Sequence, residues 1–168
     1  MDPFANLLDA GHQLGGAVRR FLFADPDDIA LIIAPILPNG VPVYAGMRSA
    51  LPDHVVSPLR ADRSTDGLIV EVEEHAPFTG NRVVIVDDGV ETGTAARAAH
   101  EAVRRFDPAE LILAVPVCPR QTMAELALRF DDIIAVQTPL GRRDLRWHFT
   151  EFDTIDDDAA RRMLSELT

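Results

Sequence analysis

The stretch VVIVDDGVETGT, residues 83–94, joins an apolar run to two adjacent carboxylates and a short loop of glycine and threonine. The apolar run, rich in β-branched residues, predicts a strand that is buried on both faces. Asp87 and Asp88 would then lie at the carboxyl end of this strand, where their negative charges repel each other. Either the two acids cap the following helix, or they bind hydroxyl groups or a cation.

The composition indicates one soluble globular domain. The chain has 168 residues, of which 47% are hydrophobic and 26% are charged. A net charge of −11 argues against binding to nucleic acid or to anionic membranes. There is no lysine, since all 16 basic residues are arginine, and this excludes Schiff-base chemistry and the lysine-dependent P-loop. Residues 1–20 have the pattern of neither a signal peptide nor a transmembrane span, so we expect a cytoplasmic protein.

Strand-like and helix-like segments alternate along the chain. Short apolar or alternating runs predict strands at 28–35, 54–59, 68–75, 82–88, 110–117 and 132–138. Helical patterns occupy 7–23, 42–51, 92–106, the segment after Pro119 and the segment from Asp156. Residues 60–67 are polar and rich in turn-forming residues. We therefore expect a single α/β domain over residues 1–168, with a mostly parallel five-stranded sheet flanked by helices.

The loop after the two acids has the chemistry of an anion site. Gly89 and Gly93 allow tight turns and close approach to a ligand, and Thr92 and Thr94 offer hydroxyl donors. A helix that begins here presents unpaired amides, which suit a phosphate. The carboxylates favour hydroxyl donors or a hydrated divalent cation. A sugar phosphate with free vicinal hydroxyls satisfies both halves.

Two other interpretations compete with a sugar phosphate site. The acids of a generic α/β protein can form a solvated strand end that caps the following helix. Receiver domains of two-component signalling also place paired acids after a strand and hold magnesium there. They place them after the first strand, however, and require a later lysine, whereas here the acids lie near mid-chain and lysine is absent. The receiver domain is therefore excluded.

Residues 83–95, VVIVDDGVETGTA, resemble the signature of the type I phosphoribosyltransferases: four apolar residues, two acids, two spacers and a Thr/Gly loop. The resemblance extends over nearly the whole chain. LPNGVPV at 37–43, LAVPVCPRQTMAEL at 113–126 and HFTEF at 148–152 are similar to a bacterial group of these enzymes with unassigned substrate. It implies a phosphoribosyltransferase-like fold with a mobile loop and edge strand at about 53–80, and a C-terminal hood and helix at about 138–168.

The resemblance also implies roles for individual residues. Asp87 and Asp88 would engage the ribose hydroxyls of phosphoribosyl pyrophosphate, either directly or through water bound to Mg²⁺. The ion itself would be held mainly by the substrate and by water, with Asp87 and Asp88 nearby. The residues implied to bind this substrate are Asp87, Asp88, Gly89, Val90, Glu91, Thr92, Gly93, Thr94 and Ala95. The implied pyrophosphate loop comprises Leu37, Pro38, Asn39 and Gly40.

Three departures from the family pattern bear on activity. Glu91 lies where the purine-specific members have aspartate, so it is a catalytic candidate alongside Asp87 and Asp88. It either accepts a proton from the incoming base or is a solvated side chain beside the phosphate. Ala95 replaces a residue that is often a phosphate-binding threonine. The LPNG loop lacks the arginine of the similar bacterial group, so either the pyrophosphate site is weak or an arginine comes from elsewhere.

Arg60 and Arg63 are the candidates for that positive charge, because a guanidinium suits phosphate oxygens. Either one can equally be an ordinary surface arginine. Trp147, Phe149 and Phe152 follow the last core strand, where the resemblance places the hood. One of them stacks on the base, or all of them fill the core.

The sequence therefore predicts a magnesium-dependent transferase that joins ribose 5-phosphate to a nucleobase-like acceptor and releases pyrophosphate. The resemblance also implies a homodimer, and neither nucleic acid nor membrane is an expected partner. The alternative is a phosphoribosyltransferase fold that has been retained as a nucleotide-binding or regulatory module without catalysis.

Overall fold

The computed structural model describes residues 1–24 and 28–168. Its helices are α1 (Leu7–Ala24), α2 (Gly40–Met47), η1 (Arg48–Ala50), α3 (Thr94–Arg104), α4 (Arg120–Leu126), η2 (Leu145–His148) and α5 (Asp157–Leu167). Its strands are β1 (Leu31–Leu37), β2 (Val55–Val56), β3 (Leu59–Ser64), β4 (Gly67–Val72), β5 (Arg82–Val86), β6 (Glu110–Val117) and β7 (Asp132–Gln137). No helix within the described ranges is long and apolar enough to cross a membrane.

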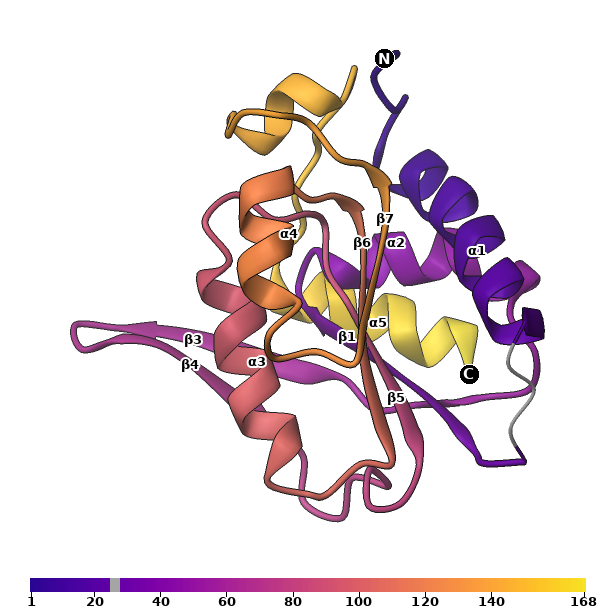
Figure 1. The fold of residues 1–168 in the computed structure, drawn as a ribbon. Coiled ribbons are helices and arrows are strands. Elements are labelled where there is room, and N and C mark those ends of the chain that lie inside the picture. The colour runs from indigo at the N-terminus through magenta and orange to yellow at the C-terminus, as the bar shows by residue number, and fades with distance from the viewer. Residues whose placement is uncertain (25–27) are drawn as a thin grey trace.

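The strands form one mostly parallel sheet, as the sequence predicts. Its order is β4-β3-β1-β5-β6-β7, with β2 paired to β1. Among these described strands the β3–β4 pair is antiparallel and the other pairs are parallel. The prediction of five strands is wrong, because the residues that the structure describes form a sheet of seven strands. Much of the polar stretch 60–67 is strand β3, which forms a hairpin with β4 that projects away from the body of the molecule (Figure 1).

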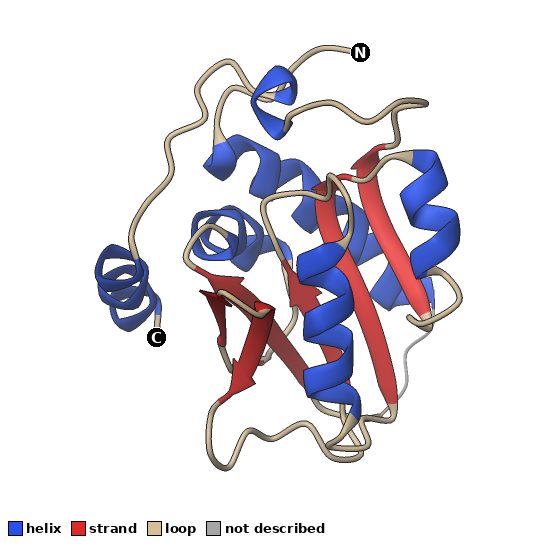
Figure 2. Ribbon diagram, turned by 90° about the vertical axis from the view of Figure 1, so that its left-hand side faces the viewer, coloured by secondary structure: helices blue, strands red, loops and turns tan. Residues whose placement is uncertain are grey.

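Helices cover both faces of the sheet (Figures 1 and 2). On one face α1, α2 and α5 bury Leu14, Tyr44 and Leu164 in a common core. On the other, α3 and α4 bury Ala99 and Leu126 in a second core. The central strands are buried on both faces, which explains why their sequences are continuously apolar rather than alternating.

The order of the strands places a binding crevice between β1 and β5. After β1 the chain continues to β2 and β3 on one side of β1, whereas β5, β6 and β7 lie on the other side. In open parallel sheets, ligands bind at such a switch point, beyond the carboxyl ends of the strands. The segments that leave β1 and β5 there begin with Pro38 and Asp87.

Candidate active site

Asp87 and Asp88 follow β5 directly and are both partly buried. The backbone N–H of Asp88 donates a hydrogen bond of 2.9 Å to Asp87 Oδ1. Burial, together with the neighbouring charge of Asp88, raises the pKa of Asp87 well above its usual range, and burial raises the pKa of Asp88 to about 6. Ionising both acids is therefore costly in this site, and hydroxyl donors or a cation would stabilise their charged forms.

The loop after the acids leads into α3. The Val90 N–H donates to the Val117 carbonyl at 2.8 Å, which ties the loop to the end of β6. The hydroxyls of Thr92 and Thr94 lie 3.1 Å apart, and Gly93 precedes the helix in the left-handed conformation. These two hydroxyls lie beside the unpaired amides of the first turn of α3. Together they form a cluster of hydrogen-bond donors that suits a phosphate.

The segment after β1 lies against the end of β5. A Cβ on Gly40 would come within 2.6 Å of the Val86 carbonyl oxygen, so this close approach requires glycine. The Asn39 side chain lies near the Asp88 carboxylate and partly offsets the rise in its pKa, while Asn39 Oδ1 accepts the Ile155 N–H at 3.1 Å. Pro38 and Asn39 line a cavity of about 410 Å³ that Asp87, Asp88 and other residues also border. The predicted pyrophosphate loop and the acid pair therefore share one cavity.

The segment 138–156, called the hood below, closes the other side of the acid pair. Phe4 and Phe149 form a parallel bridge, in which the Phe4 N–H donates to the His148 carbonyl and the Thr150 N–H donates to the Phe4 carbonyl. Leu145 N–H donates to Glu91 Oε1 at 2.9 Å. A Cβ on Gly89 would lie 2.5 Å from Leu145 Cδ2, so the hood packs directly on the turn after β5.

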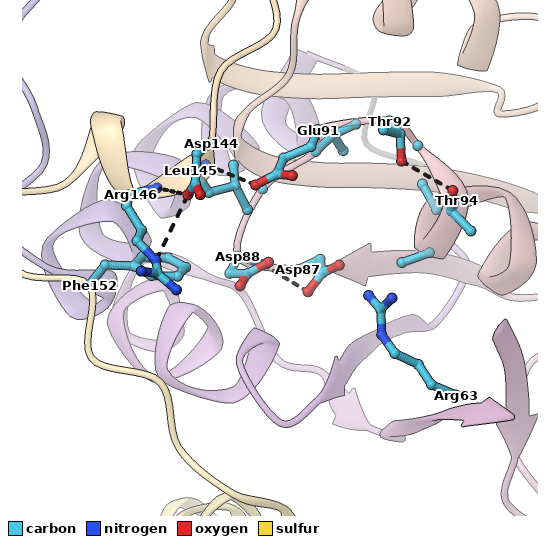
Figure 3. A pocket seen from close by; sticks show the side chains of 15 residues that line it. Arg63, Asp87, Asp88, Glu91, Thr92, Thr94, Asp144, Leu145, Arg146 and Phe152 are labelled. Carbon is cyan, nitrogen blue, oxygen red and sulfur yellow. Dashed lines mark hydrogen bonds and ion pairs between the residues drawn. The ribbon is translucent and has the colours of Figure 1, made fainter. Parts of the chain in front are cut away.

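A second cavity of about 450 Å³ lies between the turn after β5 and the hood. Residues 87–96 line one side of it, and Asp144, Leu145, Arg146 and Phe152 line the other. Arg63, from β3, borders both cavities. Figure 3 shows Arg63 and Arg146 on opposite sides of Asp87 and Asp88. The acid pair is thus flanked by two guanidinium groups.

Of the predicted arginines and aromatic residues, some line the cavities and others do not. Arg63 lines the cavities, whereas Arg60 forms an ion pair with Glu71 at 3.9 Å and lines neither. Phe152 lines the cavity of the acid pair, but Phe149 is buried between Phe4 and Phe152, with ring centroids 5.4 and 5.0 Å away.

Other hood residues differ from the expectation in other ways. Trp147 is 73% exposed and does not line either cavity. Asp144, Leu145 and Arg146 line the cavity of the acid pair, although no sequence pattern distinguishes Arg146 from Arg142 and Arg143.

The two carboxylates of the acid pair fit a hydrated divalent cation such as Mg²⁺. Among the residues that the structure describes, no group of three or more His, Cys, Asp or Glu side chains is placed to hold a metal. Asp87 and Asp88 are two partly buried oxygen donors with raised pKa values, so a hydrated cation beside them would relieve their repulsion.

Comparison with known families decides the classification of the chain. Residues 16–137 match the family described as "Phosphoribosyl transferase domain". The chain belongs to the type I phosphoribosyltransferase family. Two Mycobacterium tuberculosis proteins named "Putative phosphoribosyl transferase", from strains CDC 1551 and H37Rv, are 36% identical to it over 80 residues. That stretch covers 48% of this chain and 17% of each relative, so the chain spans under a fifth of the length of the curated relatives it matches.

Solved structures share the fold of this phosphoribosyltransferase-family chain. TT1426 from Thermus thermophilus has a TM-score of 0.76 at 19% identity and covers 99% of both chains. A hypoxanthine phosphoribosyltransferase from Staphylococcus aureus has a TM-score of 0.60 at 13% identity, covering 79% of this chain and 75% of its own. A purine phosphoribosyltransferase from Pyrococcus horikoshii has a TM-score of 0.57 at 18% identity, covering 79% and 89%. These likenesses support the fold.

The family match covers one part of the candidate site of this phosphoribosyltransferase-family protein and leaves out another. It includes the acid pair, the loop at 91–95 and the segment 38–40, but it ends at residue 137. The hood, with Arg146 and Phe152, lies beyond it. The hood residues that line the cavity of about 450 Å³ opposite residues 87–96 therefore lie outside the family match.

Proposed function

We propose that the protein is a magnesium-dependent phosphoribosyltransferase that transfers ribose 5-phosphate from phosphoribosyl pyrophosphate to a nucleobase-like acceptor. One observation carries the proposal: a pair of partly buried carboxylates and a phosphate-type loop border the same cavity at the switch point of the sheet. The acids suit the ribose hydroxyls, and the loop suits the 5′-phosphate. We infer a homodimer as well, from the resemblance alone.

Each part of the cavity has a place in this proposed reaction. The acceptor nitrogen would bond to C1 of the ribose as the bond from C1 to pyrophosphate breaks, and the proton of that nitrogen would pass to water or to the departing pyrophosphate. Asp87 and Asp88 would orient the ribose and stabilise the positive charge that develops on its ring. Arg63 would bind the pyrophosphate, supplying the positive charge that the segment 38–40 lacks. Magnesium, when bound, supplies charge neutralisation on the leaving pyrophosphate.

A binding module without catalysis is the second candidate. Ala95 offers no hydroxyl to the phosphate, and the segment 38–40 contains no arginine, and both features would weaken the site. In either case the ligand stabilises the folded protein by mass action. Catalysis alone separates the two candidates.

The experiment has two stages. First, thermal unfolding is followed with phosphoribosyl pyrophosphate and Mg²⁺, and we expect the melting temperature to rise. Second, pyrophosphate release is measured with a panel of purines, pyrimidines and simple aromatic amines. Release with one acceptor supports the transferase. A rise in melting temperature without any release favours the binding module, and no rise contradicts both.

A further inference from the structure

Glu91 is exposed, yet its carboxylate forms a contact across 54 residues of sequence. Its Oε1 accepts a 2.9 Å hydrogen bond from the backbone N–H of Leu145. Figure 3 shows the Glu91 side chain directed toward the hood at Leu145, away from Thr92 and Thr94. Because this hydrogen bond joins two segments that are far apart in sequence, it can hold the hood in place.

Leu145 is the point where the hood meets the turn after β5. Its side chain is 9% exposed and occupies the space that a side chain on Gly89 would fill. It also begins η2, where Asp144 Oδ1 accepts the Arg146 N–H at 3.0 Å. Any movement of Leu145 would therefore move Asp144 and Arg146, its neighbours on the cavity wall.

A second side chain anchors the other end of the hood in the same way. Asn39 Oδ1 accepts the Ile155 N–H at 3.1 Å, and Asn39 borders the same cavity as Asp88. Phe152 lies between these two anchors in sequence and lines the cavity. The turn after β5 and the segment after β1 thus each contribute one side chain, Glu91 and Asn39, that accepts a hydrogen bond from a backbone N–H of the hood.

We infer that Glu91 is a positioning residue that holds the hood, and through it Arg146 and Phe152, on the acceptor side of the site. The inference rests on the proposed transferase function. A general base needs its lone pair within reach of the proton that it takes. Glu91 instead directs one carboxylate oxygen at a backbone amide of the hood, and the geometry assigns it to that contact.

Two substitutions separate positioning from proton transfer. Glu91→Gln keeps an oxygen that accepts the Leu145 N–H but loses basicity, whereas Glu91→Ala loses both. We expect Glu91→Gln to retain kcat within about threefold. We expect Glu91→Ala to raise the KM of the acceptor about tenfold, with the affinity for phosphoribosyl pyrophosphate within about twofold of wild type. A general base would instead make both variants lose kcat by about 10²–10⁴-fold, and that result would overturn the inference.

A readout that does not need activity is the amide hydrogen exchange of Leu145, followed by NMR. We expect exchange at Leu145 to accelerate about tenfold in Glu91→Ala and to stay close to wild type in Glu91→Gln. Glu125→Gln is the matched control, because Glu125 is exposed on α4 and its side chain contacts no described residue through a hydrogen bond or ion pair. Unchanged exchange at Leu145 in Glu91→Ala overturns the positioning role. Absence of pyrophosphate release from the wild-type protein instead contradicts the proposed function, so the two failures are distinguishable.

Discussion

The turn after β5 and the hood border the same cavity, but different interactions hold them. In the turn, neighbouring residues contact each other: Asp88 N–H donates to Asp87 Oδ1, and the hydroxyls of Thr92 and Thr94 lie 3.1 Å apart. The hood is held by partners far away in sequence, including Phe4, Ala5 and Asn39. Much of one half of the site, the turn, is thus encoded locally, although the Val90 N–H also donates to the distant Val117 carbonyl. The other half, the hood, forms only when the whole domain has folded.

Removing the acid pair tests the local half and has the largest expected effect. Asp87→Asn with Asp88→Asn keeps the size of both side chains but removes the charge that would stabilise the ribose ring. We expect pyrophosphate release to fall about 10³-fold, since one lost electrostatic group typically costs about 10²–10³ in rate. Asp66→Asn, in the exposed turn between β3 and β4, is the control. A loss of less than tenfold in release by the double variant contradicts the role of the acids.

Gly89→Ala tests the junction of the two halves. Gly89 has a φ of +151°, which L-residues rarely adopt, and the new Cβ would lie 2.5 Å from Leu145 Cδ2. We expect the free energy of unfolding to fall by about 2–3 kcal/mol, measured with urea, and the NMR signals of Leu145 to shift. Gly141→Ala is the matched control in the hood, because an added Cβ there meets no described atom within 4 Å. Equal losses in the two variants would mean that Leu145 does not pack on Gly89.

The buried strands and the acid pair could be predicted from the sequence, whereas strand β3 could not. The buried strands and the position of the acid pair follow from local pattern, because a strand that is covered on both faces must be apolar throughout. Strand β3 is not evident from the sequence, since its polar residues lie in a hairpin that projects into solvent. Its strand conformation comes from pairing, with Leu59 beside Ile36 of β1 and Val72 of β4.

The hood could not be predicted in the same way. Its contacts depend on Phe4, Asn39 and Glu91, none of which is close to it in sequence. Among three arginines within residues 142–146, only the fold determines that Arg146 lines the cavity. The two predicted arginines of β3 are separated by geometry: side chains alternate along a strand, so residues three apart point to opposite faces.

The pH dependence of stability tests whether the pKa of Asp88 is raised in the folded protein. Burial raises the pKa of Asp88 to about 6, above its ordinary value of 3.8. Between these values the folded state binds more protons than the unfolded state, so stability falls as pH rises from about 4 to 6. We expect the free energy of unfolding of Asp88→Asn to lack this part of the fall. Between pH 4 and pH 7 it should therefore rise by about 2 kcal/mol relative to that of the wild type. Parallel urea-unfolding profiles for the two proteins would show that Asp88 is not held at a raised pKa.

Arg63→Ala and Arg60→Ala form a matched pair on β3. Arg63 borders both cavities, whereas Arg60 pairs with Glu71 outside them. We expect Arg63→Ala to weaken the binding of magnesium pyrophosphate about fivefold to tenfold, about 1–1.4 kcal/mol by calorimetry, because one guanidinium contact to phosphate is lost. Arg60→Ala should stay within about 1.5-fold of wild type. Equal effects of the two substitutions would indicate only a general loss of positive charge.

The smallest expected effect concerns the hood itself. Phe152 is partly buried and lines the cavity, whereas Trp147 is 73% exposed and lies outside the lining. Leucine at position 152 keeps an apolar contact to Phe149 but removes the ring face on which a planar acceptor would stack. We therefore expect Phe152→Leu to raise the KM of the acceptor about twofold to threefold in steady-state assays, with kcat unchanged, and Trp147→Leu to leave both constants unchanged. If Trp147→Leu has the larger effect, the acceptor contacts the outer face of the hood, and the cavity between the hood and the turn after β5 is not where it binds.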